Sequence, residues 1–319
     1  MVEEGATAVK RRGWLRRGLR SESNPLLIKE LRGRMRGARA FVVLTVYLAL
    51  LSCFTTIIYY TYSASARGPG GGVDTAELGK TIFGSVILVE IFMVAFITPA
   101  FAAGAISGER ERKTYELLQT TLLSGRQLVF GKLAAALTYV LLLIMAAVPL
   151  ESLAFVLGGV VVEELALALV ILLVTAFVFA AAGLCFSSLA RTTLVSTVLT
   201  YAMALLATVG LPMLLLLFAV VLVDPFTSGF SSSSLPWTAQ AALTYALYLT
   251  AGLSPVTAAI FTEVALEEES AVWYFWQDVD ATHRVPIPSA WIVYTVVYLA
   301  LALVLLLVAV RRVRRQEMR

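Results

Sequence analysis

The sequence predicts an all-α integral membrane protein with six transmembrane helices. Hydrophobic residues make up 59% of the 319 residues and charged residues only 14%, and the mean hydropathy is +0.85. Soluble domains carry roughly a quarter charged residues, so a water-soluble core would not absorb this composition. Six apolar runs are long enough to cross a bilayer core of about 30 Å. They are residues 41–62, 82–106, 128–150, 165–189, 194–223 and 290–310.

The basic residues predict the orientation of these spans. Of the 25 Lys and Arg residues, only Arg67, Lys80 and Arg284 fall on one side. The rest lie on the other side, in the first 40 residues, the later loops and the end of the chain. By the positive-inside rule, both termini and the loop 107–127 are expected in the cytoplasm. An even number of crossings follows.

The N-terminal region is expected to lie on the membrane surface. Asn24-Pro25 is a typical helix start, and the following run places apolar residues on one face and basic residues largely on the other. Such a helix lies in the headgroup plane, although a solvated cytoplasmic helix is the alternative. The apolar face consists of Leu27, Ile28, Leu31 and Met35. We therefore expect three parts: a cytoplasmic tail and interfacial helix (1–39), a six-span domain (40–310) and a basic cytoplasmic tail (311–319).

Glu90 is the ionisable residue that the sequence places well inside a predicted span. Such residues are costly in a bilayer and often functional, so Glu90 is a candidate for a role in transport. It is equally compatible with a protonated side chain that is hydrogen-bonded to a neighbouring helix.

Small residues follow Pro99 at the cytoplasmic end of the second span. Proline is expected to kink this helix. Ala100, Gly104 and Gly108 recur every four residues, a spacing that lets another helix backbone approach closely. This pattern predicts either a hinge beside the loop that follows or ordinary helix packing.

The region 224–289 is predicted to be external. Within it, residues 237–261 are apolar, but a seventh crossing would place the basic C-terminus outside. We expect two short re-entrant or surface helices with a break at Gly252–Pro255. The fifth span is long enough to be tilted or broken, and Gly210-Leu-Pro212 is the expected position of a break. Trp273 and Trp276 belong to an aromatic cluster typical of the interfacial belt, or they line an exit for a lipid-like substrate.

Catalytic and metal-binding patterns are nearly absent. The single histidine, His283, cannot form a metal cluster with two cysteines in apolar spans. The stretch from Gly125 to Leu133 resembles a P-loop, but five residues separate its glycines and Leu133 replaces the Ser or Thr that would hold magnesium. We expect no metal or cofactor on this chain and no ATP hydrolysis by it.

The loop between the second and third spans carries the sharpest signal. Glu109 and Lys113 are four residues apart, with the acid first, which favours a helix. Tyr115, Leu118 and Leu122 then fall on one face of a short amphipathic helix. This face is suited to docking into a groove on a cytoplasmic partner. Alternatively, the loop only sets topology and packs on the bilayer.

Residues 98–133, TPAFAAGAISGERERKTYELLQTTLLSGRQLVFGKL, resemble the signature of ABC type-2 exporter permeases. The stretch NPLLIKELRGRMR (24–36) is similar to the N-terminal connecting helix of that family, and LSPVTAA (253–259) to the stretch before its last span. The turn at 121–124 lacks the proline usual in the family. The matching positions are Pro99, Ile106, Gly108, Glu109, Arg110, Glu111, Thr114, Glu116, Leu117, Leu118, Ser124, Gly131 and Lys132.

The resemblance implies a six-span permease that pairs with a second copy or a paralogue. Separate cytoplasmic ATPase subunits would bind ATP and Mg and act through a short coupling helix. The implied coupling residues are Glu109, Arg110, Glu111, Arg112, Lys113, Thr114, Tyr115, Glu116, Leu117 and Leu118, with Glu109–Arg112 as the polar connection and Tyr115, Leu117 and Leu118 as the apolar contact. Function would then be export across a prokaryotic plasma membrane, of a lipid-like, drug-like or peptide-like substrate since few charges are buried.

Two other functions stay open. The chain could be the membrane subunit of a non-transporting ABC assembly that passes mechanical work to an external partner. It could also be a stand-alone secondary transporter, although one intramembrane carboxyl group and no visible internal repeat argue against that. Nucleic acid is not an expected partner, because contact with membrane lipids explains the basic residues more simply.

Overall fold

The computed structural model describes residues 38–65, 74–114, 125–218, 237–269, 272–280 and 283–317. The predicted interfacial residues Leu27, Ile28, Leu31 and Met35 lie outside these ranges, as do Tyr115, Glu116, Leu117 and Leu118. The helices are α3 (Ala38–Ser65), α4 (Thr75–Ala102), α5 (Ser107–Glu111), α7 (Gly125–Val156), α8 (Val162–Leu189), α9 (Thr193–Leu205), the π-helical η1 (Leu206–Gly210), α10 (Leu211–Phe218), α12 (Trp237–Ala251), α13 (Pro255–Glu269) and α14 (Ala290–Glu317). The strands are β1 (Tyr274–Asp280) and β2 (His283–Pro288).

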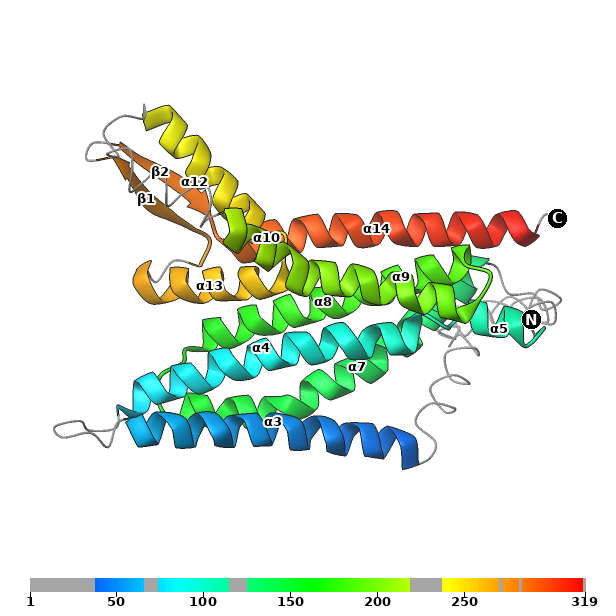
Figure 1. Ribbon diagram of the computed structural model, residues 1–319, viewed down its shortest axis with the longest axis horizontal. Helices are drawn as coiled ribbons and strands as arrows, with labels where there is room; N and C mark the ends of the chain where they lie inside the picture. The colour runs from blue at the N-terminus through cyan, green and yellow to red at the C-terminus, as the bar shows by residue number, and fades with distance from the viewer. Residues whose placement is uncertain are drawn as a thin grey trace, which may run out of the picture.

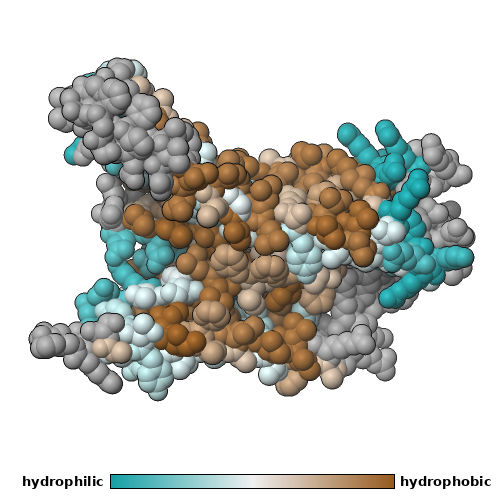
Figure 2. Space-filling model, viewed as in Figure 1, coloured by the Kyte–Doolittle hydropathy of each residue, from teal (hydrophilic) through white to brown (hydrophobic). Residues whose placement is uncertain are grey.

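The six-span prediction is confirmed within the described ranges. Six stretches are long and apolar enough to cross a membrane: Phe41–Ala64, Thr75–Glu111, Gly125–Val156, Val162–Leu189, Thr193–Leu217 and Ala290–Arg315. They run roughly along the long axis of the molecule (Figure 1). Apolar side chains form a belt around the middle, with hydrophilic side chains at both ends (Figure 2). The chain is therefore an all-α integral membrane protein in its spanning part.

Helix α8 is the centre of the bundle and the most buried of the six spans. It packs against α4, α7, α9, α13 and α14. Small residues at 180–183 allow this close packing: a Cβ atom added to Gly183 would lie 2.6 Å from the Cβ of Ala102 on α4. By contrast, α3 and the fifth span are the least buried.

The fifth span is continuous, which corrects the predicted break at Gly210-Leu-Pro212. The backbone widens into the π-helical segment η1, and the N–H of Leu211 donates to the carbonyl of Leu206, five residues back. Helix α10 then continues through Pro212. A π-turn shifts the hydrogen-bond ladder by one residue, and this adjustment accommodates a proline that has no N–H to donate.

Charge separates the two ends of the bundle. One end, where α3 begins and α14 finishes, carries basic residues and is called the basic end. Its described basic residues include Arg110, Arg112, Lys113, Arg126, Arg191, Arg311, Arg312, Arg314 and Arg315. The opposite end is called the acidic end and carries Asp74, Glu77, Glu163, Glu164, Glu263 and Glu267, together with Lys80. Helix α14 continues to Glu317, so four of these arginines extend a spanning helix.

Helices α12 and α13 meet in a tight turn beside α14. The Tyr298 hydroxyl donates to the carbonyl of Leu253 in this turn, at 2.8 Å, and Ser254 and Ala258 are fully buried. Tyr298 lies eight residues into α14, which corresponds to a depth of about 12 Å at 1.5 Å per residue. The turn is thus shielded by protein, as irregular backbone at membrane depth requires. Its re-entrant placement stays a prediction.

Two paired β-strands, 274–280 and 283–288, form a hairpin where the sequence predicted an aromatic cluster of the interfacial belt or of a substrate exit, and no strands. The strands β1 and β2 are antiparallel, with Trp276 opposite Pro286. Phe275, Val285 and Ile287 alternate inward and pack with Ala241 and Ala265. Alternating aromatic and β-branched residues favour strands, and both strands are edges, which tolerate proline. The hairpin and α12 stand together beside the bundle (Figure 1).

Candidate functional site

The candidate site is built on an interruption of the second span at the basic end. Helix α4 ends at Ala102, three residues after the buried Pro99, and the backbone turns before α5 begins at Ser107. The N–H groups of Ile106 and Ser107 both donate to Oγ of the buried Ser187 on α8, at 2.9 Å. The hydroxyl oxygens of Ser107 and Ser187 are 3.1 Å apart. Ser187 therefore supplies the partner that an unwound buried backbone needs.

The small residues after Pro99 pack against α9. A Cβ atom added to Gly104 would lie 3.2 Å from Cγ2 of Thr193, and one added to Gly108 would lie 3.7 Å from its Oγ1. Ala100, the third member of the predicted ridge, is exposed instead. The Ser196 hydroxyl donates to the carbonyl of Ala103 at 2.7 Å, which holds α9 against the turn. The close contact with α9 therefore starts beyond Ala100.

Glu109 connects α5 to the third span. Its Oε1 receives Nζ of Lys132 on α7 at 2.7 Å. The Lys132 side chain is 3% exposed and that of Glu109 is 25% exposed. An ammonium group this well buried requires a charged partner, because its desolvation is costly when unpaired. The pair therefore fixes the spacing between α5 and α7.

Arg110 and Glu111 connect α5 to the junction between α8 and α9. Arg110 Nη1 donates to the carbonyl of Ala190 at 2.8 Å. The Glu111 carboxylate receives the Thr193 N–H at 2.7 Å and the Thr193 hydroxyl at 2.8 Å. Thr193 opens α9, so Glu111 satisfies a free N–H at a helix start, where negative charge is favourable.

The next residues point away from these contacts. Arg112, Lys113 and Thr114 are exposed. Lys113 has φ of 58°, in the left-handed region, and so terminates α5. The described chain resumes at Gly125, the first residue of α7. Glu109, Arg110 and Glu111 thus contact α7, the residue that follows α8 and the start of α9, and the next three residues lie at the surface of the basic end.

The family of the chain can now be given. Residues 25–317 match the family model described as ABC-2 family transporter protein. This match covers most of the chain, and it includes the interrupted second span and α5. The chain belongs to the ABC-2 transporter family. The comparison with curated proteins gives no match.

Family membership identifies the ABC-2 chain as a multi-pass transporter membrane protein of the permease type. Short charged and hydrogen-bonded contacts join α5 to α7, α8 and α9.

A second group of polar residues lies in the bundle interior. Glu90 is fully buried on α4, and the hydroxyl of the buried Tyr47 on α3 donates to its Oε1 at 2.8 Å. Glu151 on α7 is only 2% exposed and lies beside Glu90. Glu151 does not stand out in the sequence as an intramembrane residue, because the apolar run of the third span ends at residue 150. Helix α7 continues to Val156, so Glu151 lies within the span.

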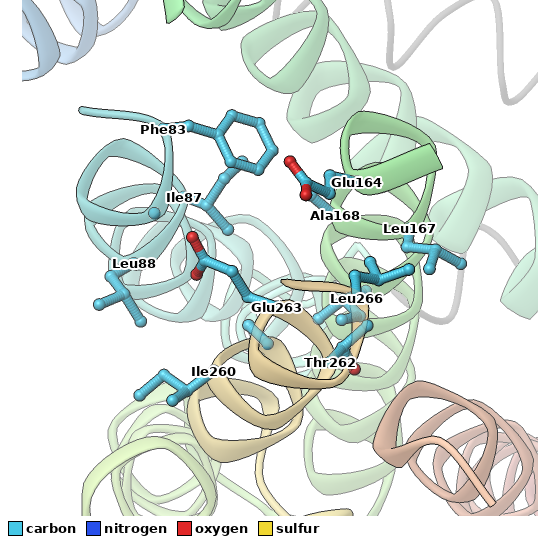
Figure 3. A pocket seen from close by; sticks show the side chains of 13 residues that line it. Phe83, Ile87, Leu88, Glu164, Leu167, Ala168, Ile260, Thr262, Glu263 and Leu266 are labelled. Carbon is cyan, nitrogen blue, oxygen red and sulfur yellow. The ribbon is translucent and has the colours of Figure 1, made fainter. Parts of the chain in front are cut away.

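A cavity of about 30 Å³ lies at the acidic end between α4, α8 and α13. Glu164 and Glu263 both point into it from different helices (Figure 3). A Cβ atom on Gly84 of α4 would lie 2.8 Å from Oε1 of Glu263, so the Glu263 carboxyl group packs directly against α4. This volume is enough for one or two water molecules and too small for an organic substrate.

Burial raises the pKa of Glu263, and the negative charges of Glu164 and Glu267 add to this effect. Together they bring the pKa to about 7. The positive charge of Lys80 acts in the opposite direction. Lys80 pairs with Glu267 at 2.9 Å, which joins α4 to α13. Because both partners are substantially exposed, this pair contributes little to stability.

The aromatic residues Trp273 and Trp276 lie beside the acidic end and are 64% and 50% exposed. Trp273 packs near Trp291 of α14, with 5.5 Å between ring centroids. Both the interfacial belt and a substrate exit stay open as their role.

Sequence reasoning missed Ser187 and Glu151 altogether. The signal for Glu151 was its position directly after the predicted third span.

Proposed function

We propose that this chain is the permease subunit of an ATP-driven exporter in a prokaryotic plasma membrane. Both termini lie in the cytoplasm. Separate ATPase subunits bind ATP and Mg, and the permease pairs with a second copy or a paralogue. The chain itself carries no cofactor. The ABC-2 family match supports the general assignment.

One observation supports the coupling part of this proposal: three consecutive residues of α5 attach to α7, to the end of α8 and to the start of α9. Glu109 pairs with Lys132, Arg110 bonds to the Ala190 carbonyl, and Glu111 caps α9. A loop that only set topology would need basic residues but no such contacts. A loop that transmits force needs a firm attachment to the membrane helices.

The proposed contact with the ATPase is the surface that follows α5. Arg112, Lys113 and Thr114 are exposed at the basic end. Tyr115, Leu117 and Leu118 continue the sequence as the proposed apolar anchor for a groove on the ATPase. In this arrangement the two halves of the motif have separate tasks. Residues 109–111 transmit force, and residues 112–118 bind the partner.

An apolar cargo fits the lipid-facing surface of the bundle. An open groove of about 520 Å³ runs between α7, α8 and α14, and its lining is almost entirely apolar. This volume is in the range of drug-sized ligand sites. Leu141, Leu173 and Leu299 are partly exposed along it, so a lipid-like chain could enter sideways from the bilayer.

The decisive experiment is purification of the chain from its native membranes in a mild detergent, followed by mass spectrometry. An ATPase subunit recovered in equal amount would support the exporter. A chain recovered alone that still moved solute in liposomes without ATP would overturn it and favour a secondary transporter. Recovery with an ATPase, but no ATP-dependent movement of any apolar cargo, would favour the non-transporting assembly.

Matched variants separate binding from transmission in the same preparation. We expect Tyr115→Ala with Leu118→Ala to insert normally and to lose the ATPase. We expect Glu111→Ala to retain the ATPase and lose ATP-driven transport. Filling the groove with Thr138→Phe should reduce transport of a fluorescent phospholipid with the ATPase still bound. Normal recovery of the ATPase with the first variant would contradict the proposed contact.

A further inference from the structure

Two carboxyl groups lie together inside the bundle, away from the site at α5. Glu90 on α4 is 0% exposed and Glu151 on α7 is 2% exposed. The side chains are neighbours, and Tyr47 on α3 contributes its hydroxyl to Glu90 Oε1 at 2.8 Å. Three spans thus converge on one polar cluster. We call Glu90 and Glu151 the carboxyl pair.

The two carboxyl groups can satisfy each other only through a proton. Oε2 of Glu90 and both carboxyl oxygens of Glu151 are buried and receive no hydrogen bond from another residue, but the two side chains lie within hydrogen-bonding reach of each other. Native proteins satisfy nearly all buried polar atoms, because each unpaired one costs the free energy of its desolvation. Ionised carboxylates only accept hydrogen bonds, so a hydrogen bond between these two groups requires that one of them be protonated.

The negative charges of the carboxyl pair also favour a bound proton. The titratable groups that meet here are Glu90 from α4, Glu151 from α7 and the Tyr47 hydroxyl from α3. In the described part of the chain, Lys132 and Lys80 have their carboxylate partners at the two ends of the bundle instead. Two adjacent carboxylates without a cation would repel each other in a medium that already disfavours one charge.

The surroundings favour a proton over a metal ion. On the buried faces of α4 and α7, the residues one turn away from the pair are apolar and fully or nearly fully buried: Val86, Ile87, Val94, Ala147 and Ala154. A sodium or calcium ion needs about six oxygen ligands, and the cluster offers two carboxyl groups and one phenol. Among the described residues, no group of three His, Cys, Asp or Glu side chains could hold a metal ion.

We propose that Glu90 and Glu151 form a proton-binding site inside the membrane domain. One of the two carboxyl groups carries the proton and donates a hydrogen bond to the other, while the Tyr47 hydroxyl donates to Oε1 of Glu90. Tyr47 comes from α3, the least buried span, so withdrawal of α3 would remove a donor and change the proton affinity of the site. The inference concerns this chain alone and does not depend on the ATPase.

The experiment uses the full-length chain in lipid nanodiscs at about pH 8.5, well above the pKa of about 7 at Glu263. Infrared spectroscopy should detect the C=O stretch of a protonated carboxyl group that shifts in heavy water. The band should disappear in Glu90→Gln with Glu151→Gln and shift in Tyr47→Phe. The Tyr47→Phe variant keeps both carboxyl groups. If the tyrosine had a purely structural role, the band of this variant would therefore stay at its wild-type frequency.

Chemical labelling tests the wild-type chain without any substitution. Dicyclohexylcarbodiimide reacts with protonated carboxyl groups in apolar surroundings, and peptide mapping should locate its adduct at Glu151 or Glu90. Ion-paired Glu109 serves as the internal control and should remain unmodified. Absence of both the band and the adduct would overturn the proposal. Loss of both on addition of sodium would overturn it too, and would identify a cation site.

Discussion

The Glu109–Lys132 pair shows why single residues matter at the basic end. Sequence reasoning rejected the stretch containing Lys132 as a P-loop and gave the lysine no role beyond its family position. In the fold its side chain is nearly buried, and its ammonium group pairs with the Glu109 carboxylate at 2.7 Å. Removing either member of this pair takes the ion partner away from a buried or half-buried charge, so the direction of the effect is predictable.

We expect Lys132→Met to lower the stability of the chain by about 2–3 kcal/mol, somewhat below the range for fully buried pairs because Glu109 is a quarter exposed. The double variant Glu109→Gln with Lys132→Met should regain most of this loss, because no charge is left unpaired. Thermal unfolding in detergent measures both. Equal unfolding temperatures for Lys132→Met and the wild type would show that the pair contributes nothing.

A pH prediction follows from Glu263. Its pKa in the folded chain, about 7, lies above the ordinary value of 4.5, so the folded state binds the proton more tightly than the unfolded state. Stability contributed by this proton is therefore fully present below about pH 4.5 and is lost as pH rises through 7. Glu263→Gln should unfold a few degrees higher than wild type at about pH 8 and at about the same temperature near pH 4.5.

The contrast with Glu267 provides a control for that prediction. Glu267 shares α13 but is paired with Lys80 and is more exposed. Glu267→Gln should therefore not raise the unfolding temperature at high pH. A rise equal to that of Glu263→Gln would assign the effect to the overall charge of the acidic end.

At the scale of whole elements, hydrophobicity predicts the spans because a bilayer imposes length and composition on each of them. The spans at 128–150 and 165–189 were predictable for this reason. The hairpin β1–β2 was not, because residues 274–288 lie outside the spans, where no such rule applies. Its stability depends on Ile287 and Phe275 packing on α12, a contact between distant segments.

The contacts between helices were likewise only partly predictable from the sequence. The spacing of Ala100, Gly104 and Gly108 predicted a close approach of two helices, yet the tightest contact in that region involves Gly183 on α8 and Ala102. Small residues indicate that a close contact exists somewhere on a helix. The partner helix and the register depend on tertiary packing that a spacing rule does not contain.

We therefore expect Gly183→Ala to weaken the contact between α4 and α8. The added Cβ would lie 2.6 Å from Ala102 Cβ and 3.0 Å from backbone atoms, so the helices must separate, at a cost of about 1–3 kcal/mol. Gly108→Ala is the matched control, since its Cβ would meet only Thr193 at an ordinary 3.7 Å. A stable Gly183→Ala chain with an unstable Gly108→Ala chain would contradict this packing.

For the whole molecule, the separation of charge between the two ends predicts how the chain sits in the membrane. Arg311, Arg312, Arg314 and Arg315 extend α14 at the same end as α5. Cationic ends remain on the cytoplasmic side during insertion and contact its anionic lipids. The acidic end, with the hairpin and the cavity at Glu263, would then face outward.

Site-directed labelling tests this orientation. In a background of Cys53→Ser with Cys185→Ala, which removes both native cysteines, one exposed residue at each end is replaced: Thr75→Cys and Arg112→Cys. A membrane-impermeant maleimide added to intact cells should label Thr75→Cys at once and Arg112→Cys only after lysis. The reverse pattern would place α5 outside the cell, out of reach of any cytoplasmic ATPase, and would remove the physical basis for coupling through Glu109, Arg110 and Glu111.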